Sequence, residues 1–260
     1  MPNKLLKQLE AVMPAGMQVP QPITQLYYWI EKRNLFVDNE GGRIGFLYPE
    51  NLLKASWTDE GRDGGTEIEF AAEGSTNLHY WFGAEHEEVN QRLCVFAQTG
   101  GEGSMGAFWL SDSGEVKVVH LGSGSGSTLT CVLADNCVDF LRLLAIGYNE
   151  ICWNDEFASR PLDNDEFVVQ PNIEFQNWVR DTFGLTIPET ALEIVKYPSS
   201  MDDEESKDEF WNWCQKFQSV QQEESKEQIL AMASAMKEVG VELQQIIVIT
   251  GLSAAEIEAL

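Results

Sequence analysis

A change of hydrophobic period within residues 92–153 constrains the fold more than any other feature of the sequence. Short apolar runs come first, at Leu93–Ala97, Gly106–Leu110 and Val116–Leu121, with Gly-, Asp- and Ser-rich turns between them. Such runs are typical of consecutive antiparallel strands. Apolar residues then recur three and four positions apart, which predicts a helix: Val138, Leu141, Leu144 and Ala145. A helix must cover an apolar surface, and this sheet directly precedes it. The sequence therefore predicts an α+β fold.

The residues before this segment are expected to extend the same fold. Apolar spacing predicts helices at Asn3–Val12 and Ile23–Arg33, the second introduced by prolines. Strands are expected at Arg43–Tyr48, Thr66–Ala71 and Asn77–Phe82. The stretches between them are expected as connections: Pro49–Leu53 as a turn or short helix, Trp57–Gly65 as a loop, and Gly83–Gln91 as a charged connection. The fold class is therefore an antiparallel (mixed) sheet flanked by helices.

The chain becomes acidic and helical after Trp153. Helices at Ile173–Phe183 and Pro188–Val195 are expected to extend the first domain from about residue 154. Ser199–Glu209 then carries a run of acids with Lys207 as its single base. Because like charges repel and resist compaction, this run predicts a linker. We therefore expect an α+β domain at 1–198, an acidic linker at 199–209 and a helical segment at 210–260.

The C-terminal segment is expected to contain helices only. The predicted ranges are Phe210–Val220, Gln222–Val239, Val241–Ile249 and Ser253–Leu260. Ser253 and Glu256 have the spacing of a capping box at the start of the last helix. The end of the chain superficially resembles a helix-turn-helix, but its acidic surroundings argue against DNA binding. A packing or oligomerisation unit is the favoured interpretation.

Several short motifs in the first domain resemble the SMI1/KNR4 family, also called the SUKH superfamily. They are a Gly-rich turn, an aromatic strand, a Gly-centred hairpin and a late Asp-Phe-Leu step: Gly100–Gly103, Phe108–Trp109, Gly114–Val116 and Asp139–Leu141. The resemblance covers residues 20–153 and includes the proline-initiated helix at Ile23–Arg33. The family usually has an Asn-Gly turn after that helix, whereas Asp38–Gly42 keeps only the turn chemistry.

The resemblance implies an immunity protein that binds and neutralises a cognate bacterial toxin by covering its surface. The toxin is expected to be basic, with a nuclease-type effector domain as the leading candidate. A smaller part of the family consists of regulatory scaffold proteins. In that alternative, the C-terminal helices would serve as an oligomerisation arm. Both roles are performed by binding alone.

The net charge of −25, from 42 acidic and 17 basic residues, limits the classes of partner. Nucleic-acid affinity depends on Lys and Arg neutralising phosphates, so the sequence predicts no nucleic-acid partner. Anionic membrane surfaces are disfavoured for the same reason. A basic protein would instead be attracted and steered towards this surface. The alternative is that the acidity only keeps a cytoplasmic protein soluble.

The cysteine pattern, the N-terminal residues and the length of the apolar stretches together predict a cytoplasmic protein. The five cysteines include no CxxC pair, which argues against a zinc ribbon or a redox motif. Buried free thiols in a reducing compartment are the simplest interpretation. The N-terminal residues lack the apolar core of a signal peptide, and no stretch approaches membrane-spanning length.

The sequence contains no convincing catalytic pattern, since G-x-S-x-G, H-E-x-x-H, Walker and EF-hand motifs do not occur. His79 and His120 lie on predicted strands and leave open a metal pair, or a Cys94–His120 nucleophile system. Glu102 leaves open a general base, although a solvated turn acid is the simpler interpretation. Gly122–Ser127 is interpreted as a flexible loop, because no P-loop spacing follows it. We therefore expect no enzyme, no cofactor and no metal.

Acidic turns beside aromatic residues are the candidate partner-binding sites. Acids provide charge for docking, and aromatic anchors provide buried contact area. One patch joins Glu102 and Asp112 near Trp109. The other lies further along the chain: Trp153, Asp155, Glu156, Phe157, Asp163 and Asp165. The alternative is that the aromatic residues are core. That alternative is favoured for Trp109 and left open for Phe157.

Overall fold

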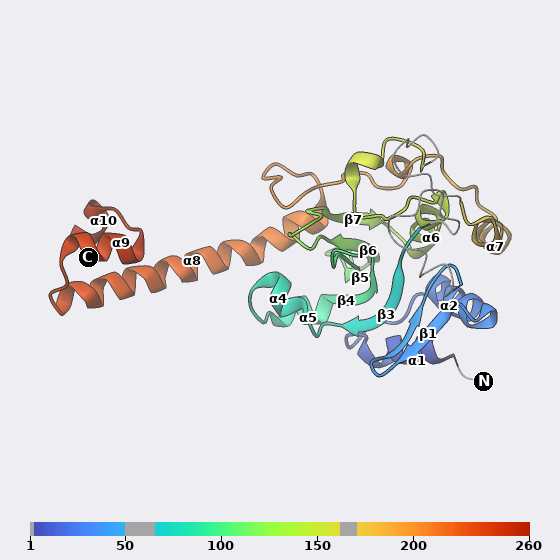
Figure 1. The fold of residues 1–260 in the computed structure, drawn as a ribbon, viewed down its shortest axis with the longest axis horizontal. Helices are drawn as coiled ribbons and strands as arrows, with labels where there is room; N and C mark the ends of the chain where they lie inside the picture. Colours follow the sequence, from blue (N-terminus) through green and yellow to red (C-terminus); the bar gives the residue numbers. More distant parts are fainter. Residues whose placement is uncertain (1–2, 50–65, 162–170) are drawn as a thin grey trace. The chain divides into compact units, whose positions relative to one another are not determined.

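The computed structural model describes residues 3–49, 66–161 and 171–260 (Figure 1). Contacts divide the chain into two compact units, Met1–Asn212 and Trp213–Leu260. The first unit holds the sheet, and the second consists of helices. The α+β class is therefore confirmed.

The first unit contains a seven-stranded antiparallel sheet whose spatial order follows the sequence. The strands are β1 (Phe36–Asn39), β2 (Gly42–Gly45), β3 (Glu69–Gly74), β4 (Leu93–Gln98), β5 (Met105–Leu110), β6 (Val116–Leu121) and β7 (Thr130–Ala134). The expected meander is confirmed as β4, β5 and β6, and each pair of neighbours is antiparallel. Antiparallel neighbours can be joined by short connections, as β4, β5 and β6 are.

A row of aromatic rings across the central strands forms the middle of the core. Phe96 of β4 stacks on Phe108 of β5 with ring centroids 4.0 Å apart, and it also faces Phe70 of β3 at 6.4 Å. Tyr27 of α2 (Gln21–Arg33) meets Phe70 edge-on. Phe140 of α6 (Cys137–Ile146) meets Phe96 edge-on. The aromatic row therefore joins three strands to two helices.

The opposite face of the sheet is covered by a later part of the chain. Trp109 follows Phe108 in β5, so its side chain points to the other face. It is 1% exposed, and its ring lies 5.3 Å from the ring of Phe210. Trp109 is therefore a core residue, as the sequence favoured.

The helices begin and end largely where capping residues predict. Asn136 caps α6 by accepting hydrogen bonds from the backbone N–H groups of Val138 and Asp139. Asn172 caps α7 (Ile173–Phe183), and Gly184 ends it in the left-handed conformation that glycine favours. In α1 (Lys4–Val12), the buried residues are Leu5 and Leu9.

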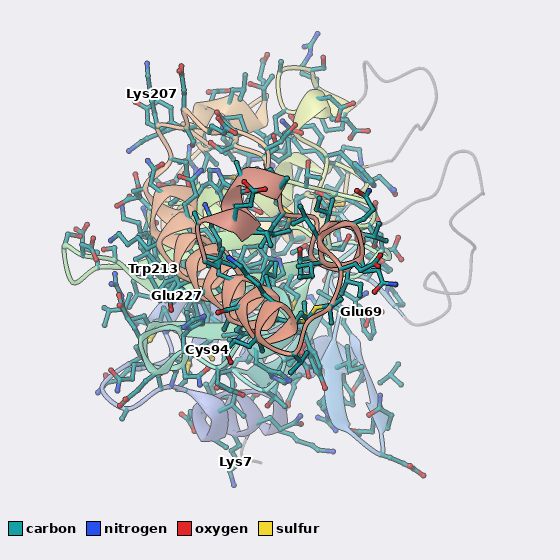
Figure 2. All side chains as sticks on the ribbon, turned by 90° about the vertical axis from the view of Figure 1, so that its left-hand side faces the viewer. Lys7, Glu69, Cys94, Lys207, Trp213 and Glu227 are labelled. Atoms are coloured by element: carbon teal, nitrogen blue, oxygen red, sulfur yellow. The ribbon has the colours of Figure 1, made fainter. Side chains whose placement is uncertain are left out.

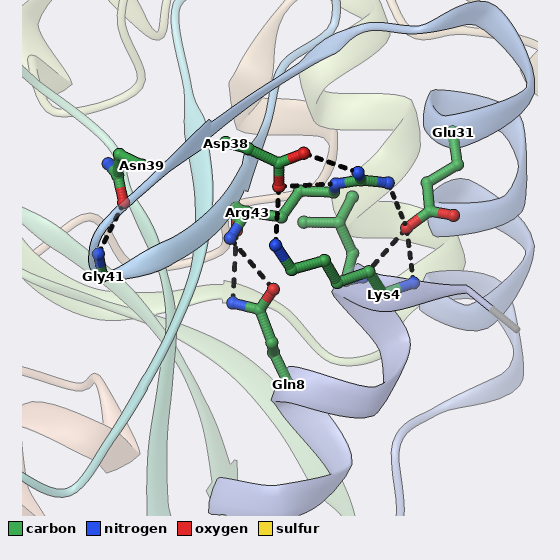
Figure 3. Close-up of polar contacts among 8 residues, drawn as sticks. Lys4, Gln8, Glu31, Asp38, Asn39, Gly41 and Arg43 are labelled. Carbon is green, nitrogen blue, oxygen red and sulfur yellow. Dashed lines mark hydrogen bonds and ion pairs between the residues drawn. The ribbon is translucent and has the colours of Figure 1, made fainter.

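A charged cluster fixes α1 against the β1–β2 hairpin (Figure 3). Arg43 donates hydrogen bonds to Asp38 at 2.7 and 3.1 Å and forms an ion pair with Glu31 at 3.2 Å. Lys4 pairs with the same Asp38 carboxylate at 2.8 Å. Hydrogen bonds from Arg43 and Lys4 hold the pKa of Asp38 well below its usual range. Gln8 accepts from the Arg43 backbone N–H, which adds a neutral tie to the same hairpin.

Two stretches between β3 and β4 contain helices that the sequence did not predict, and the strand expected in the first stretch is wrong. Asn77–Phe82 is expected as a strand but contains α4 (Leu78–Phe82), and the charged connection contains α5 (Glu87–Arg92). Leu78 and Phe82 are both buried, and a spacing of four residues places them on one helical face. The expected strand Arg43–Tyr48 ends early, since β2 stops at Gly45. The expected stretches at 50–53 and 57–65 lie outside the described residues.

Three expected helices between residues 188 and 239 also differ. Pro188–Val195 contains only a 3-10 turn, η3 (Ala191–Glu193), held by a capping box between Thr190 and Glu193. The two helices expected within 210–239 form one continuous helix, α8 (Glu209–Glu238).

The acidic segment expected as a linker lies along the last strand of the sheet. Thr130 N–H donates to the Ser199 carbonyl at 2.7 Å, and Val132 N–H donates to the Asp208 carboxylate at 2.9 Å. The other Asp208 oxygen accepts from Trp211 N–H at 2.8 Å, at the start of α8. An exposed strand edge carries unpaired backbone groups. This segment therefore belongs to the first unit and covers its sheet edge, and the boundary between the two units falls within α8.

The second unit has a small core of its own. Helices α9 (Leu243–Thr250) and α10 (Ala254–Glu258) pack with the end of α8 around four buried residues: Ala233, Ile246, Leu252 and Ile257. The predicted capping box of Ser253 and Glu256 is confirmed. Lys237 Nζ donates to the carbonyls of Ile257 and Glu258, which stabilises the end of α10.

Asp208 gives a test of the edge contact through the pH dependence of stability. Burial raises the pKa of Asp208 from 3.8 to about 6, although the N–H donors oppose this effect. The folded chain then holds the proton more tightly than the unfolded chain. Stability should fall as pH rises through this window, by up to about 3 kcal/mol for this group. Urea unfolding at a series of pH values measures that loss.

The Asp208→Asn variant should lack this component of the pH profile. It should also be less stable at low pH, because an amide cannot accept both N–H groups. Glu204→Gln is the matched control, since Glu204 is an exposed acid in the same segment. Parallel pH profiles of Asp208→Asn and the wild type would contradict the assignment.

Candidate functional site

The Gly-rich turn between β4 and β5 is built around two glutamates. Gly101 N–H donates to Glu150 Oε1 at 3.0 Å, which ties the turn to the segment that follows α6. Glu102 accepts hydrogen bonds from the backbone N–H and the hydroxyl of Ser104. The turn therefore has a defined conformation, with the Glu102 carboxylate held by neutral donors.

The Gly/Ser spacer packs against this turn. Ser123 N–H donates to Ser104 Oγ at 3.1 Å, and Ser127 Oγ donates to the Cys152 carbonyl at 2.5 Å. A Cβ atom at Gly126 would lie 2.5 Å from Glu102 Cγ, so only glycine fits there. The spacer expected as a flexible loop is therefore hydrogen-bonded in place beside Glu102.

His120 lies in the core beneath the turn. Its Nδ1 is 2.7 Å from the Leu129 carbonyl, which can only accept, so Nδ1 carries the proton. Its Nε2 then accepts from the Thr99 hydroxyl at 2.9 Å. Burial lowers the pKa of His120 to about 4, so the ring is neutral near pH 7. Both side chains are fully buried, and this pair is closed to a substrate.

The structure does not assemble the other candidate chemical groups. His79 lies at the surface, with its ring 3.8 Å from that of Tyr80, whereas His120 is buried. Cys94 Sγ lies 3.8 Å from the Val12 carbonyl, and burial raises the pKa of its thiol to about 12. Within the described residues, no three His, Cys, Asp or Glu side chains gather as metal ligands.

A groove opens beside Glu102, and we call it the Tyr80 groove. Its volume is about 420 Å³, and its lining comes from β3, α4, the β4–β5 turn and the spacer: Glu73, Asn77, Tyr80, Trp81, Gln98, Glu102, Gly103, Met105, Ser123 and Ser125. Tyr80 is 77% exposed. Trp81 is held by a hydrogen bond from Nε1 to the Gly122 carbonyl at 2.7 Å.

The chemistry of the Tyr80 groove suits a cationic side chain. Two carboxylates, from Glu73 and Glu102, lie beside two aromatic rings, and no Lys or Arg is among the described lining residues. The Glu73 carboxylate accepts from the neutral amide of Asn77, as Glu102 does from Ser104. Lysine and arginine pair with carboxylates and also with aromatic faces. The groove therefore offers two kinds of contact to one cation.

The expected partner-binding residues have different positions. Glu102 lines the Tyr80 groove. Asp112 is exposed and forms an ion pair with Arg92 at 2.7 Å, away from the groove lining. Trp153 is 36% exposed and donates from Nε1 to Glu150 at 2.8 Å, so it supports the turn from below. The first expected patch is therefore divided.

The second expected patch is partly core. Phe157 is fully buried, with its ring 5.9 Å from that of Tyr148. Asp155 and Glu156 lie on the 3-10 turn η1 (Asn154–Glu156), and burial together with neighbouring acids raises the pKa of Glu156. Asp163 and Asp165 lie outside the described residues. Phe157 therefore provides no exposed anchor.

Sequence reasoning missed the most exposed aromatic of the groove. Tyr80 and Trp81 belong to the stretch expected as a strand, and Glu73 is the second residue after the expected strand Thr66–Ala71. The available signal was the adjacent Tyr-Trp pair, which sits between acidic stretches.

None of the described helices combines the length and the apolar character needed to cross a bilayer. No family model matches the chain. Searches among curated proteins and among solved structures also give no match. The resemblance to the SMI1/KNR4 family therefore stays a prediction.

His120 gives a test of the core beneath the turn. Its pKa falls from 6.5 in the unfolded chain to about 4 in the fold, because burial disfavours the charged ring. Between these values the unfolded chain binds the extra proton, so stability should decrease as pH falls. The loss is up to about 3 kcal/mol for this group. Asp208 acts with the opposite sign in this pH range, so the test is the difference between two urea-unfolding profiles. The free energy of unfolding of the wild type minus that of His120→Gln should decrease between pH 7 and pH 4.

The His79→Gln variant is the control, because His79 lies at the surface. Its profile should follow the wild type. A His120→Gln profile as steep as that of the wild type would contradict the buried neutral ring.

Proposed function

We propose that this chain is a non-catalytic immunity protein of the SMI1/KNR4 type. It acts in the bacterial cytoplasm, where it binds and neutralises a cognate toxin with a basic, nuclease-type effector domain. The observation that carries the proposal is the Tyr80 groove, where exposed aromatic surface meets two carboxylates that lack a basic neighbour in the lining. The net charge of −25 extends the same preference to the whole chain.

Binding alone is sufficient for this role. A nuclease must present cations to the phosphates of its substrate, so its active face is basic. A strongly acidic protein competes for that face and is steered towards it by long-range attraction. Short-range contacts then determine how long the complex lasts.

Tyr80 is the expected anchor of the interface. Exposed tyrosines lose little conformational entropy on binding and are enriched among residues that dominate binding energy. A partner cation placed over the ring adds about 0.5–2 kcal/mol, depending on how far it is desolvated. Glu73 and Glu102 then supply the charge that selects lysine or arginine.

The test uses toxin domains encoded beside the gene of this protein. Co-expression of the wild type should restore growth to cells that express the cognate toxin domain. Tyr80→Ala and Glu73→Lys should each raise the Kd of the purified complex about tenfold or more, the size of one dominant contact. Calorimetry measures the Kd, and stopped-flow mixing should show faster association at low salt.

The controls carry the same changes at other exposed positions. Tyr197→Ala replaces a tyrosine that is 49% exposed, and Glu40→Lys reverses an exposed acid in the β1–β2 turn. Both should leave the Kd unchanged. Failure of the wild type to rescue growth from every neighbouring toxin would overturn the proposed function.

A scaffold with a helical oligomerisation arm is the second candidate. One observation favours it, namely that large apolar side chains of the second unit are exposed: Val239 at 79%, Val248 at 76% and Ile249 at 59%. The sequence from Leu243 to Ala255 also contains no charged residue. Like-charged chains repel, so an uncharged apolar surface is where two copies approach at the lowest electrostatic cost.

Point variants test this arm better than a deletion that begins in the acidic segment. Such a deletion would also remove Asp208 and Phe210, which belong to the first unit. If the arm associates, the wild type should be a dimer or larger by light scattering, and the double variant Val248→Glu/Ile249→Glu should be a monomer. Gln244→Glu/Gln245→Glu adds the same charge at exposed positions of α9 and should keep the assembly. A monomeric wild type at high concentration would exclude this candidate.

A further inference from the structure

A second groove lies between helices α2 and α7 of the first unit, and we call it the Trp178 groove. It measures about 390 Å³ and has aromatic walls with polar groups between them: Gln25, Tyr28, Trp29, Lys32, Arg33, Trp178 and Thr182. The rings of Trp29 and Trp178 lie 5.5 Å apart, and Tyr28 is 53% exposed. Small-molecule sites have similar volumes and similar aromatic linings.

The charge of the Trp178 groove is opposite to that of the chain. Acids outnumber bases by 42 to 17 in the sequence, yet two bases and no carboxylate line this groove in the described part of the chain. Glu174, which is outside the lining, forms an ion pair with Arg33. Arg33 also lies over the Trp29 ring at 4.6 Å, which keeps its side chain on one wall. Lys32 is exposed and belongs to the lining.

A residue of the same groove carries a buried donor that has no acceptor among the described residues. Trp29 is 4% exposed, and its indole Nε1 has no hydrogen-bond partner among the described residues. Buried donors without acceptors cost about 1–3 kcal/mol and are rare in native proteins. This feature is independent of the charge pattern, and an acceptor oxygen supplied by a ligand would remove that cost.

We propose that the Trp178 groove binds a small aromatic anion. The ring of the ligand packs against Tyr28 and Trp178, and its carboxylate or phosphate pairs with Lys32. An oxygen of the same group accepts the Trp29 indole N–H. The ring of the ligand therefore corresponds to the aromatic walls, its charge to Lys32, and its acceptor oxygen to the Trp29 donor.

The net charge of the chain does not prevent this binding. Charges more than about 8 Å away are largely screened at physiological ionic strength, so the groups at the groove decide its local charge. Glu174 offsets Arg33 there, and Lys32 is the base available to an anion. Lys32 and Arg33 also lie in the last turn of α2, where cations offset the partial negative charge of the helix end. That effect explains the two bases but leaves the aromatic walls and the Trp29 donor unexplained.

The test uses two aromatic anions that share only a ring and an anionic group, AMP and indole-3-acetate. Both should bind the full chain in calorimetry and shift indole N–H signals in NMR spectra of the ¹⁵N-labelled protein. The Trp178→Phe variant removes one of these signals and identifies it. Adenosine, inorganic phosphate and acetate each lack one of the two features and should bind about tenfold more weakly, because each loses one set of contacts.

Lys32→Gln and Tyr28→Ala should each weaken both anions about fivefold or more, the effect of removing one exposed contact. Lys7→Gln is the matched control, because the Lys7 side chain extends into solvent from α1 (Figure 2), and its affinities should equal those of the wild type. The proposal is overturned if neither anion binds at millimolar concentration. It is equally overturned if phosphate alone binds as tightly as AMP, or if Lys32→Gln binds both anions like the wild type.

Discussion

The stack of Phe96 on Phe108 is the contact on which the rest of the first unit depends. Their rings are nearly parallel at 4.0 Å, and Phe70 and Phe140 close around Phe96 from β3 and α6. The two phenylalanines lie on the strands that the Glu102 turn connects, so their packing sets the position of that turn. Tyr27 carries the same row into α2, the helix that forms one wall of the Trp178 groove. Both grooves are thus attached to one rigid aromatic core.

The sequence predicts the elements whose apolar spacing fits only a strand or only a helix. It fails where the same spacing fits both. The meander and α6 have unambiguous patterns and are confirmed. In Asn77–Phe82, Leu78 and Phe82 satisfy a strand period of two and also a helix spacing of four, so tertiary burial decides between them. The acidic run at 199–209 misleads for another reason. Net charge predicts repulsion, but a short carboxylate such as Asp208 is also a good acceptor for backbone N–H groups.

The candidate site is less predictable than the fold, because exposure is a property of the folded surface. Glu102 is identifiable from its Gly-rich turn, and it does line a groove. Phe157 has the same local surroundings of acids but is fully buried, since the packing of Tyr148 against it cannot be read from neighbouring residues. Tyr80 is the opposite case. Its place in an apolar run predicts burial, but the side chain is 77% exposed. Composition predicts a preference for cationic partners, and the structure shows where exposed carboxylates lie beside aromatic rings.

The two grooves show that net charge and local charge act over different distances. The α4 helix of the Tyr80 groove and the α2–α7 pair of the Trp178 groove lie on opposite sides of the sheet (Figure 1). The charge of −25 acts on any partner that approaches, so it accelerates encounters with cations and slows encounters with anions. Once a ligand is in contact, screening leaves only the nearest groups, which are Glu73 and Glu102 in one groove and Lys32 in the other. A protein of one sign can therefore hold ligands of both signs. The ligand of like sign must depend on aromatic contact and satisfied hydrogen bonds, because long-range attraction is not available to it.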